Sequence, residues 1–243
     1  MPPAEGMQLF PILSLGEVEP GTDLAALIAG AVAPAQPDGP ALADGDVVVV
    51  TQKIVSKAEG RLVALDHADP AAKLALVRQE SVRILRQRGD LMITETSHGF
   101  ICANAGVDLS NVADGTAALL PEDSDRSARR IRAGLEHTLG LTLGVIVSDT
   151  FGRAWRKGVT DVAIGCAGVA AVIDLKGTTD AGGRELVATE ICVADELASA
   201  AELVMGKDRG VPVAVVRGVP ASWLRPASVR SEIIRPPEED LFR

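Results

Sequence analysis

Asp46-Val47-Val48-Val49-Val50-Thr51 is the strongest structural signal in the chain, because five β-branched residues follow one another without a break. Such residues fit the pleated surface of a sheet, and a continuous apolar run of this length suits a buried strand. Residues 143–147 form a second hydrophobic strand, which ends directly in Ser148-Asp149-Thr150. Both predicted strands therefore lead into polar residues.

The spacing of apolar residues predicts the other elements. Strands are predicted at residues 61–65, 91–94, 100–103 and 211–216, and those at 91–94 and 100–103 form a hairpin. Helices are predicted at residues 70–88, from 124 or 125 to 137, and at 194–205, where apolar side chains recur every three or four positions. The elements lack the strict alternation of a doubly wound parallel sheet, which favours an α+β fold with mixed sheets.

The composition excludes several classes of protein. Of 243 residues, 47% are hydrophobic and 23% are charged, a globular rather than a disordered balance. The net charge of −9 argues against nucleic-acid binding, because neutralising phosphates requires a basic face. No apolar run can span a bilayer and no signal peptide is visible, so we expect a cytoplasmic protein without a membrane partner. Cys102, Cys166 and Cys192 are expected to be reduced, buried thiols.

Standard catalytic motifs are absent from the sequence. There is no GxxxxGK[ST] phosphate loop, no GxGxxG after a strand, no HExxH and no GxSxG. Four polar segments remain: residues 51–60, 104–111, 148–158 and 205–212. Lysines in the first can meet phosphate and Asp108 in the second can ligate Mg²⁺ or Mn²⁺, but each segment alone is better explained as a solvated turn. The fourth is either a loop that cradles a nucleotide or a simple connector.

Residues 148–158, SDTFGRAWRKG, carry the clearest chemical signal. A hydrophobic strand delivers Asp149 and Thr150. Three cations follow within eight positions: Arg153, Arg156 and Lys157. A carboxylate that holds a metal beside cations that face phosphate oxygens is what phosphoryl transfer requires. A capped turn with a basic surface is the alternative, but a concentrated basic segment in so acidic a protein favours phosphate or substrate contacts.

Taken together, these segments resemble the coenzyme F420:L-glutamate ligase family. The matching stretches are GDVVVVTQKIVSKAEGRLV, CANAGVDLSNV, GVIVSDTFGRAWRKGVTDVAIGCAG, GRELVATEICVADELASAAELVMGK and VPVAVVRG. They occur in the family's order and spacing between residues 10 and 218. The ordered set is much more specific than any one stretch.

The resemblance implies an enzyme that joins the amino group of L-glutamate to a carboxylate of the deazaflavin precursor coenzyme F420-0. The reaction uses GTP and releases GDP and phosphate, and further glutamates follow through γ-linkages. A carboxylate does not react with an amine until it is activated, so an acyl phosphate is the expected intermediate. Two divalent cations, Mg²⁺ or Mn²⁺, would offset the phosphate charge, with K⁺ as a further candidate cofactor.

The resemblance also implies roles for individual residues. Asp108 and Asp149 match carboxylates expected to hold one divalent cation, and Thr150 matches a ligand of a second. Positions expected near GTP are Leu15, Gly16, Glu17, Val18, Gln52, Lys53, Lys57, Asn111, Gly206 and Lys207. A second-metal ligand in the loop from Gly206 is left unassigned.

The fold that the resemblance implies is an α+β chain of two sub-domains, which forms an intertwined homodimer. Residues 1–243 then make a single catalytic unit, either a standalone enzyme or part of a fusion to a C-terminal flavin-binding reductase domain. Two other functions stay open. One is a metal-dependent phosphohydrolase or transferase that uses the same carboxylates on another substrate, and the other is a GTP-binding module without turnover.

Overall fold

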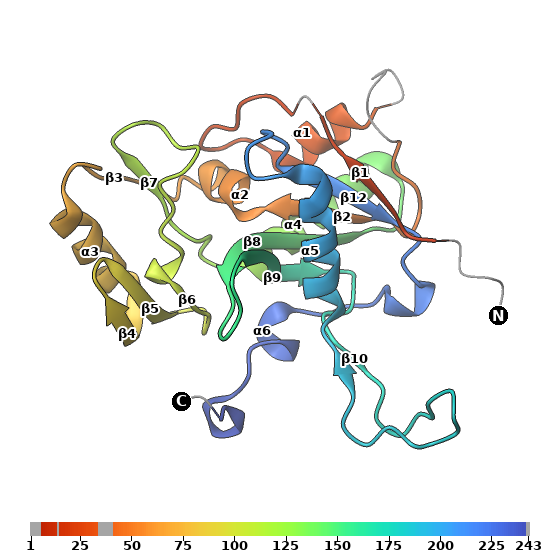
Figure 1. The fold of residues 1–243 in the computed structure, drawn as a ribbon. Coiled ribbons are helices and arrows are strands. Elements are labelled where there is room, and N and C mark those ends of the chain that lie inside the picture. Colours follow the sequence, from red (N-terminus) through yellow and green to blue (C-terminus); the bar gives the residue numbers. More distant parts are fainter. Residues whose placement is uncertain (1–5, 14, 34–40, 242–243) are drawn as a thin grey trace.

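A five-stranded sheet forms the centre of the protein in the computed structural model, which describes residues 6–13, 15–33 and 41–241 (Figure 1). In spatial order its strands are β1 (Gln8–Pro11), β12 (Val213–Arg217), β2 (Val47–Thr51), β8 (Gly144–Gly152) and β9 (Val159–Ala167). The strands predicted around residues 46–51 and 143–147 are confirmed as β2 and β8. Both lie in the interior of the sheet.

The parallel pairing of β2 and β8 determines where the chain can build a site. The register runs from Val47 opposite Gly144 to Thr51 opposite Ser148, whereas the other neighbouring pairs of this sheet are antiparallel. Residues 47–50 are fully buried, as expected for a strand that is covered on both faces. Because both strands run in the same direction, the polar residues at their carboxyl ends lie at one edge of the sheet.

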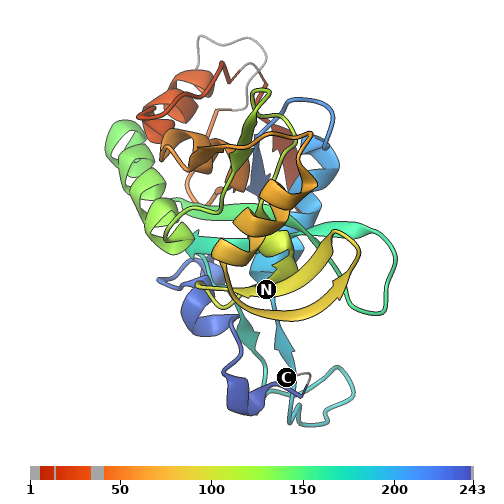
Figure 2. The ribbon, with the colours of Figure 1, turned by 90° about the vertical axis from the view of Figure 1, so that its left-hand side faces the viewer.

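Helices cover both faces of the sheet. α5 (Val193–Met205) lies on one face and α4 (Ser124–Leu139) on the other, as Figure 2 shows. α1 (Leu24–Ala31) packs beside α4, where a Cβ at Gly134 would stand 2.5 Å from the Cβ of Ala25. Only glycine therefore permits this close approach of the two helices. No helix in the described ranges is long and apolar enough to cross a membrane.

The connection from β2 to β8 carries a smaller unit, on the left in Figure 1. α2 (Gln52–Ala58) leads into it, and β3 (Leu62–Ala64) pairs with β7 (Thr116–Ala118). β5 (Leu91–Thr96) lies between β4 (Ser81–Arg88) and β6 (Ile101–Ala103), with α3 (Pro70–Gln79) beside β4. Val77 and Met92 are at the centre of a separate apolar cluster, so this unit has its own small core.

The helix predicted at residues 70–88 is wrong beyond Gln79, because Ser81–Arg88 is strand β4. The prediction rested on apolar residues at steps of three and four. β4 pairs with β5 through two irregularities, one between Ser81 and Arg83 and one between Ile84 and Arg86. Each irregularity shifts the alternation of the strand, which lets a strand imitate helical spacing, and cross-strand pairing then overrides local propensity.

The other predicted elements are confirmed with small shifts. The hairpin is β5 and β6, and the helix predicted at 194–205 is α5. α4 is capped by Asp123, which accepts a hydrogen bond from Arg126 N, rather than by Ser124 or Asp125. β1, α1, α2, β7 and β9 were not predicted. The remaining elements are β10 (Ile173–Asp174) and β11 (Glu190–Ile191) at the base of a projecting arm, α6 (Val229–Glu232), and 3₁₀ turns at Asn104–Gly106, Ala221–Trp223 and Pro237–Glu239.

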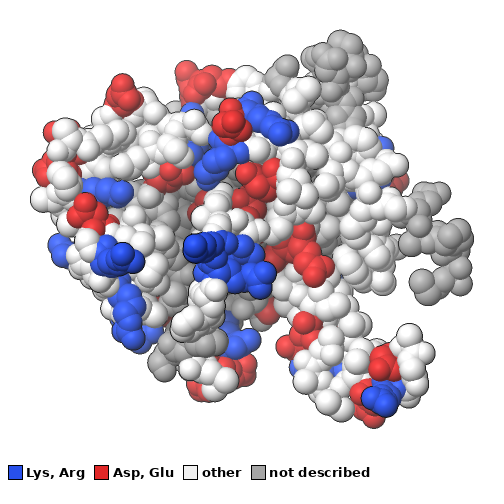
Figure 3. Space-filling model, in the orientation of Figure 1, with Lys and Arg blue, Asp and Glu red and all other residues white. Residues whose placement is uncertain are grey.

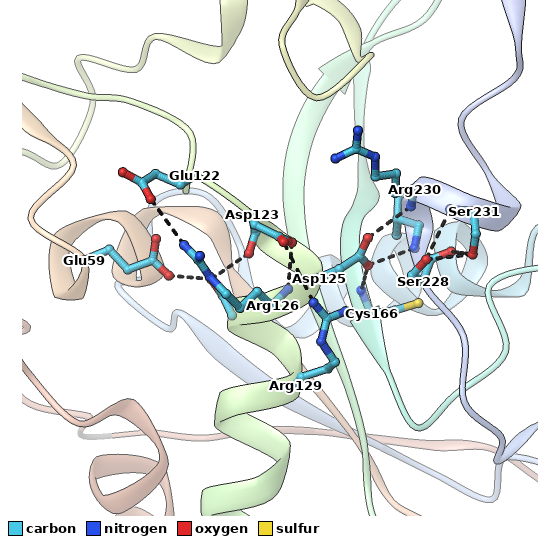
Figure 4. Close-up of polar contacts among 12 residues, drawn as sticks. Glu59, Glu122, Asp123, Asp125, Arg126, Arg129, Cys166, Ser228, Arg230 and Ser231 are labelled. Atoms are coloured by element: carbon cyan, nitrogen blue, oxygen red, sulfur yellow. Dashed lines mark hydrogen bonds and ion pairs between the residues drawn. The ribbon is translucent and has the colours of Figure 1, made fainter.

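One buried carboxylate ties the C-terminal segment to the sheet (Figure 4). Asp125 Oδ1 accepts hydrogen bonds from Cys166 N on β9 at 2.9 Å and from Val229 N on α6 at 2.8 Å. Its Oδ2 accepts from Arg230 N at 3.1 Å. Asp125 is 7% exposed, so these three donors have little access to water if the carboxylate is removed.

We therefore expect Asp125→Ala to lower the free energy of unfolding by about 2–4 kcal/mol, because buried N–H groups lose their acceptor. Urea unfolding followed by circular dichroism measures this. Glu122→Ala is the control on the same helix end, since its pair with Arg126 is exposed and should contribute less than about 1 kcal/mol. Equal unfolding midpoints for the two variants would contradict the proposed role of Asp125.

Candidate active site

A pocket of about 510 Å³ opens at the carboxyl ends of β2 and β8, where ligands commonly bind to such sheets. Most of the residues predicted from the sequence line it: Gly16, Glu17, Val18, Gln52, Lys53, Lys57, Asp108, Asn111, Asp149, Thr150, Gly206 and Lys207. Leu15 is buried next to Gly16, outside the lining. The structure thus brings segments from five parts of the sequence to one place.

The two lysines that follow β2 lie on helix α2, and not on the solvated turn that this segment alone would suggest. Lys53 and Lys57 are one helical turn apart, so both face the pocket. Each ammonium group pairs with a carboxylate from a distant segment. Lys53 Nζ lies 2.9 Å from Asp108 Oδ2, and Lys57 Nζ lies 3.0 Å from Glu17 Oε1.

Asp108 is held in its ionised form. Ser110 N and Ser110 Oγ donate to Asp108 Oδ1 at 2.7 and 2.8 Å, while Lys53 Nζ also donates to Ser110 Oγ at 2.7 Å. Burial raises the pKa of the Asp108 carboxyl, but Lys53 and Ser110 together outweigh burial and hold that pKa below its ordinary value. Asp108 is therefore an anionic oxygen donor at the pocket wall.

The carboxyl of Asp149 on β8 has its pKa shifted in the opposite direction from that of Asp108. Burial raises the pKa of its carboxyl to about 7, although a hydrogen bond from Thr150 N and the nearby Lys207 lower it. Repulsion from Asp108 and Asp161 adds to the increase. Like charges therefore converge on Asp149 from two sides, which is an arrangement that a cation would relieve.

Asp161 and Ser148 line the pocket but were not among the predicted site residues. Asp161 lies opposite Thr150 in the register of β8 and β9. Its Oδ1 accepts from Thr150 Oγ1 at 2.7 Å and its Oδ2 from Ser148 Oγ at 2.9 Å. The sequence did hold one indication of a site here, because Asp161 is the only charged residue in the strand VTDVAIGCA.

Glu202 on α5 also lines the pocket and was not predicted. Burial raises the pKa of the Glu202 carboxyl, and the charge of Asp161 adds to this, while Lys207 opposes it. Lys207 Nζ donates to Thr150 Oγ1 at 2.8 Å, so the loop after α5 contacts the end of β8 directly. In the sequence, Glu202 could not be distinguished from an ordinary solvent-exposed glutamate on a helix.

These donors fit a hard divalent cation. Asp108, Asp149 and Thr150 offer oxygen atoms on one pocket, and oxygen is what Mg²⁺ prefers. Within the described part of the chain, no three His, Cys, Asp or Glu side chains converge as a metal site. Mg²⁺ is usually held by one or two carboxylates together with substrate phosphates and water. The pocket therefore suits a cation that arrives with a nucleotide.

The basic segment lies away from this pocket. Arg153, Arg156 and Lys157 are exposed in the connection between β8 and β9 and are not among the lining residues described. Arg153 Nη2 donates to Lys157 O at 3.2 Å, which orders the tip. Trp155 between them is 91% exposed, with a positive φ of 66°. In Figure 3 a group of Lys and Arg side chains lies near the middle of the face viewed, with carboxylates beside it.

The chain matches the family model described as F420-0:Gamma-glutamyl ligase over residues 12–218, which include the segments that form the pocket. It is 42% identical to the coenzyme F420:L-glutamate ligase of Methanothermobacter thermautotrophicus, over 98% of this chain and 99% of that protein. It is also 42% identical to the protein of the same name from Methanopyrus kandleri, over 98% of each chain. A third relative of that name, from Methanocaldococcus jannaschii, is 41% identical over 82% of this chain and 85% of its own. On this evidence the chain belongs to the F420-0:gamma-glutamyl ligase family.

Proposed function

We propose that this enzyme is a GTP-dependent ligase that joins L-glutamate to a carboxylate of coenzyme F420-0 and then adds further γ-linked glutamates. Family membership supports the ligase reaction and its two organic substrates. The use of GTP is supported by one observation: three lysines lie in one pocket with Asp149 and Thr150 at the end of β8. Lys53, Lys57 and Lys207 are the point charges that would orient phosphate oxygens.

The charges of the pocket explain why a divalent cation belongs to this proposal. Five carboxylates line the pocket against three lysines: Glu17, Asp108, Asp149, Asp161 and Glu202. A triphosphate would therefore be repelled unless positive charge came with it. A bound divalent cation supplies that charge and stabilises the transferring phosphoryl group. We assign Asp108 and Asp149 to one cation and Thr150 to a second, with Mg²⁺ or Mn²⁺ as the ions and K⁺ as a further candidate.

The proposed chemistry has two steps. An oxygen of the acceptor carboxylate attacks the γ-phosphorus, the bond from that phosphorus to the β–γ bridging oxygen breaks, and GDP leaves. The amine of glutamate then attacks the acyl carbon and loses a proton, while the bond from that carbon to the phosphate oxygen breaks. Phosphate therefore leaves with one oxygen of the original carboxylate.

The cysteines support this route over a covalent acyl-enzyme. Burial raises the pKa of the Cys102, Cys166 and Cys192 thiols to about 12 each, so the reactive thiolate is scarce at neutral pH. All three thiols are free, as expected from the sequence, although Cys192 is only half-buried. An enzyme without an activated nucleophile can instead activate the substrate acid by phosphorylating it.

Arg153, Arg156 and Lys157 form the tip of the connection between β8 and β9, called the basic tip below. Its position outside the pocket suggests that these cations contact the acceptor rather than the triphosphate. Arg153 is three positions after Thr150 in the sequence, which corresponds to about 10 Å along a strand. Each ligation consumes one carboxylate and adds the two of glutamate, so the acceptor gains negative charge with every cycle. Arg153, Arg156 and Lys157 provide an exposed positive site for such an anion.

We expect Asp149→Asn to keep the fold and weaken Mn²⁺ binding in the presence of GDP by at least about 100-fold, because an amide is a poor ligand for a hard cation. Ligase activity should fall with it. Electron paramagnetic resonance of free Mn²⁺ measures the affinity, and circular dichroism checks the fold.

Two control variants belong to this experiment. Asp208→Asn removes an exposed carboxylate next to Lys207, and Arg156→Gln removes a charge at the basic tip. Both should bind Mn²⁺ and GDP like the wild type. Undiminished Mn²⁺ binding by Asp149→Asn would remove Asp149 from the cation site, and a loss in Arg156→Gln would place the tip at the phosphates.

A second prediction concerns the order of chemistry. Coenzyme F420-0 labelled with ¹⁸O at both oxygens of the acceptor carboxylate should transfer one labelled oxygen to phosphate in the first ligation, because the C–O bond to phosphate breaks when the amine attacks. Mass spectrometry of the released phosphate and of the glutamylated product measures both outcomes.

Three other results would reject parts of the proposal. Unlabelled phosphate together with normal amide formation would exclude the acyl phosphate. Phosphate release that needs neither glutamate nor the acceptor would favour the phosphohydrolase. GTP binding without any turnover would favour the regulatory module.

The homodimer implied by the family is also a proposal. The β4–β6 sheet exposes large apolar side chains, with Val82 69%, Leu91 47%, Ile84 41% and Ile101 36% accessible. Exposed apolar residues on one small sheet are typical of an interface.

We expect twice the mass of the chain in sedimentation equilibrium at micromolar concentration, with Val82→Asp shifted towards monomer. Monomer alone for the wild type would reject the dimer.

A further inference from the structure

Asp161 is a buried carboxylate with no counter-ion in the described part of the chain. It is 2% exposed, and no Lys, Arg or His side chain among the described residues lies within ion-pair distance of it. Its two oxygens accept hydrogen bonds from Thr150 Oγ1 and Ser148 Oγ, at 2.7 and 2.9 Å. A buried charge that is satisfied by two hydroxyls costs stability, so its presence points to a task at the pocket that these hydroxyls line.

The strand register explains why one carboxylate reaches both hydroxyls. Thr150 is directly opposite Asp161 in the β8–β9 pairing, and Ser148 is two residues earlier, on the same face of β8. Ser148 is opposite Ala163, after an irregularity next to Val147. All three polar side chains therefore project from the same face of the sheet towards the pocket.

The contacts with Asp161 fix the direction in which the Thr150 and Ser148 hydroxyl protons point. A hydroxyl has one proton, and Thr150 and Ser148 both donate theirs to Asp161. What Thr150 can offer to the pocket is therefore only its lone pairs. Lys207 Nζ already uses one of them, since it donates to Thr150 Oγ1 at 2.8 Å, and this ammonium group occupies a direction from which a positive ion would approach.

We propose that Asp161 is a positioning residue, which keeps the Thr150 and Ser148 hydroxyls as acceptors facing the pocket so that Thr150 can ligate a cation brought by the nucleotide. Partners that orient a ligand in this way typically change metal affinity 10–100-fold when they are replaced. Without an acceptor at Asp161, the Thr150 hydroxyl is free to turn its proton towards the cation. The inference rests on the proposed function, because it assumes that a divalent cation enters with the nucleotide.

The test is a double-mutant cycle on Mn²⁺ binding in the presence of GDP, read by electron paramagnetic resonance of free Mn²⁺ on the full chain. Asp161→Asn keeps the shape but replaces one acceptor oxygen by a donor, and Thr150→Val removes the hydroxyl. We expect each variant to weaken Mn²⁺ binding by about 10-fold or more. The double variant should be little weaker than either single one, because both act through the same hydroxyl.

Ser199→Ala is the matched control, because Ser199 lies on α5 and its hydrogen bond to Asp161 reaches only the backbone of that residue. Ser199 Oγ donates to the backbone oxygen of Asp161 at 2.7 Å and leaves its carboxylate untouched, so Mn²⁺ binding should equal that of the wild type. If Asp161→Asn does not fold, Asp161→Glu takes its place with the same expectation, because it keeps the charge and displaces the carboxylate by one methylene.

The outcomes separate this inference from the proposed function. Wild-type affinity in folded Asp161→Asn, or losses that simply add in the double variant, would overturn the role of Asp161 and leave the ligase proposal intact. A wild-type protein that does not bind Mn²⁺ with GDP would overturn both.

Discussion

The parallel pairing of β2 with β8 is the constraint on which the rest of the structure depends. Parallel strands need a crossover, and here the crossover is long enough to hold the smaller unit of the fold. Its register sets Thr51 opposite Ser148, so α2 begins beside the polar end of β8. Lys53 and Asp149 meet at one pocket for this reason, although almost one hundred positions separate them in the sequence.

The pocket is assembled from charges that do not balance one another. Lys53 and Lys57 each pair with one carboxylate, whereas Asp149 and Asp161 have no ion pair among the described residues. Burial raises the pKa of Asp149 to about 7, because a buried carboxylate loses the water that would stabilise its negative charge. Active sites often keep such imbalance because the ligand supplies the missing charge. An acidic pocket is therefore compatible with an anionic nucleotide only when cations come with it.

Local sequence signals predicted the parts of the fold and of the site that short segments determine. The β-branched run of β2 and the polar end of β8 are enough to single out Asp149 and Thr150 as candidate site residues. What could not be predicted depends on pairing between distant segments: β4 is a strand because β5 pairs with it, and Asp161 reaches its partners only once β9 folds back on β8. The basic residues near Trp155 were recognised, but the length of β8 carries them beyond the pocket.

Gln52 shows how the two units of the fold share one site. Expected near the nucleotide, it is 1% exposed and donates through Nε2 to Ser56 Oγ at 2.6 Å and to Leu119 O at 3.0 Å. Ser56 Oγ donates to the same carbonyl at 2.6 Å. Leu119 follows Ala118, whose backbone exchanges both hydrogen bonds with Asp108. The amide of Gln52 is thus used inside the protein, where it anchors the segment that carries Asp108 to the helix that carries Lys53. This buried polar contact between the units and the Lys53–Asp108 ion pair together hold Asp108 in its position relative to Asp149.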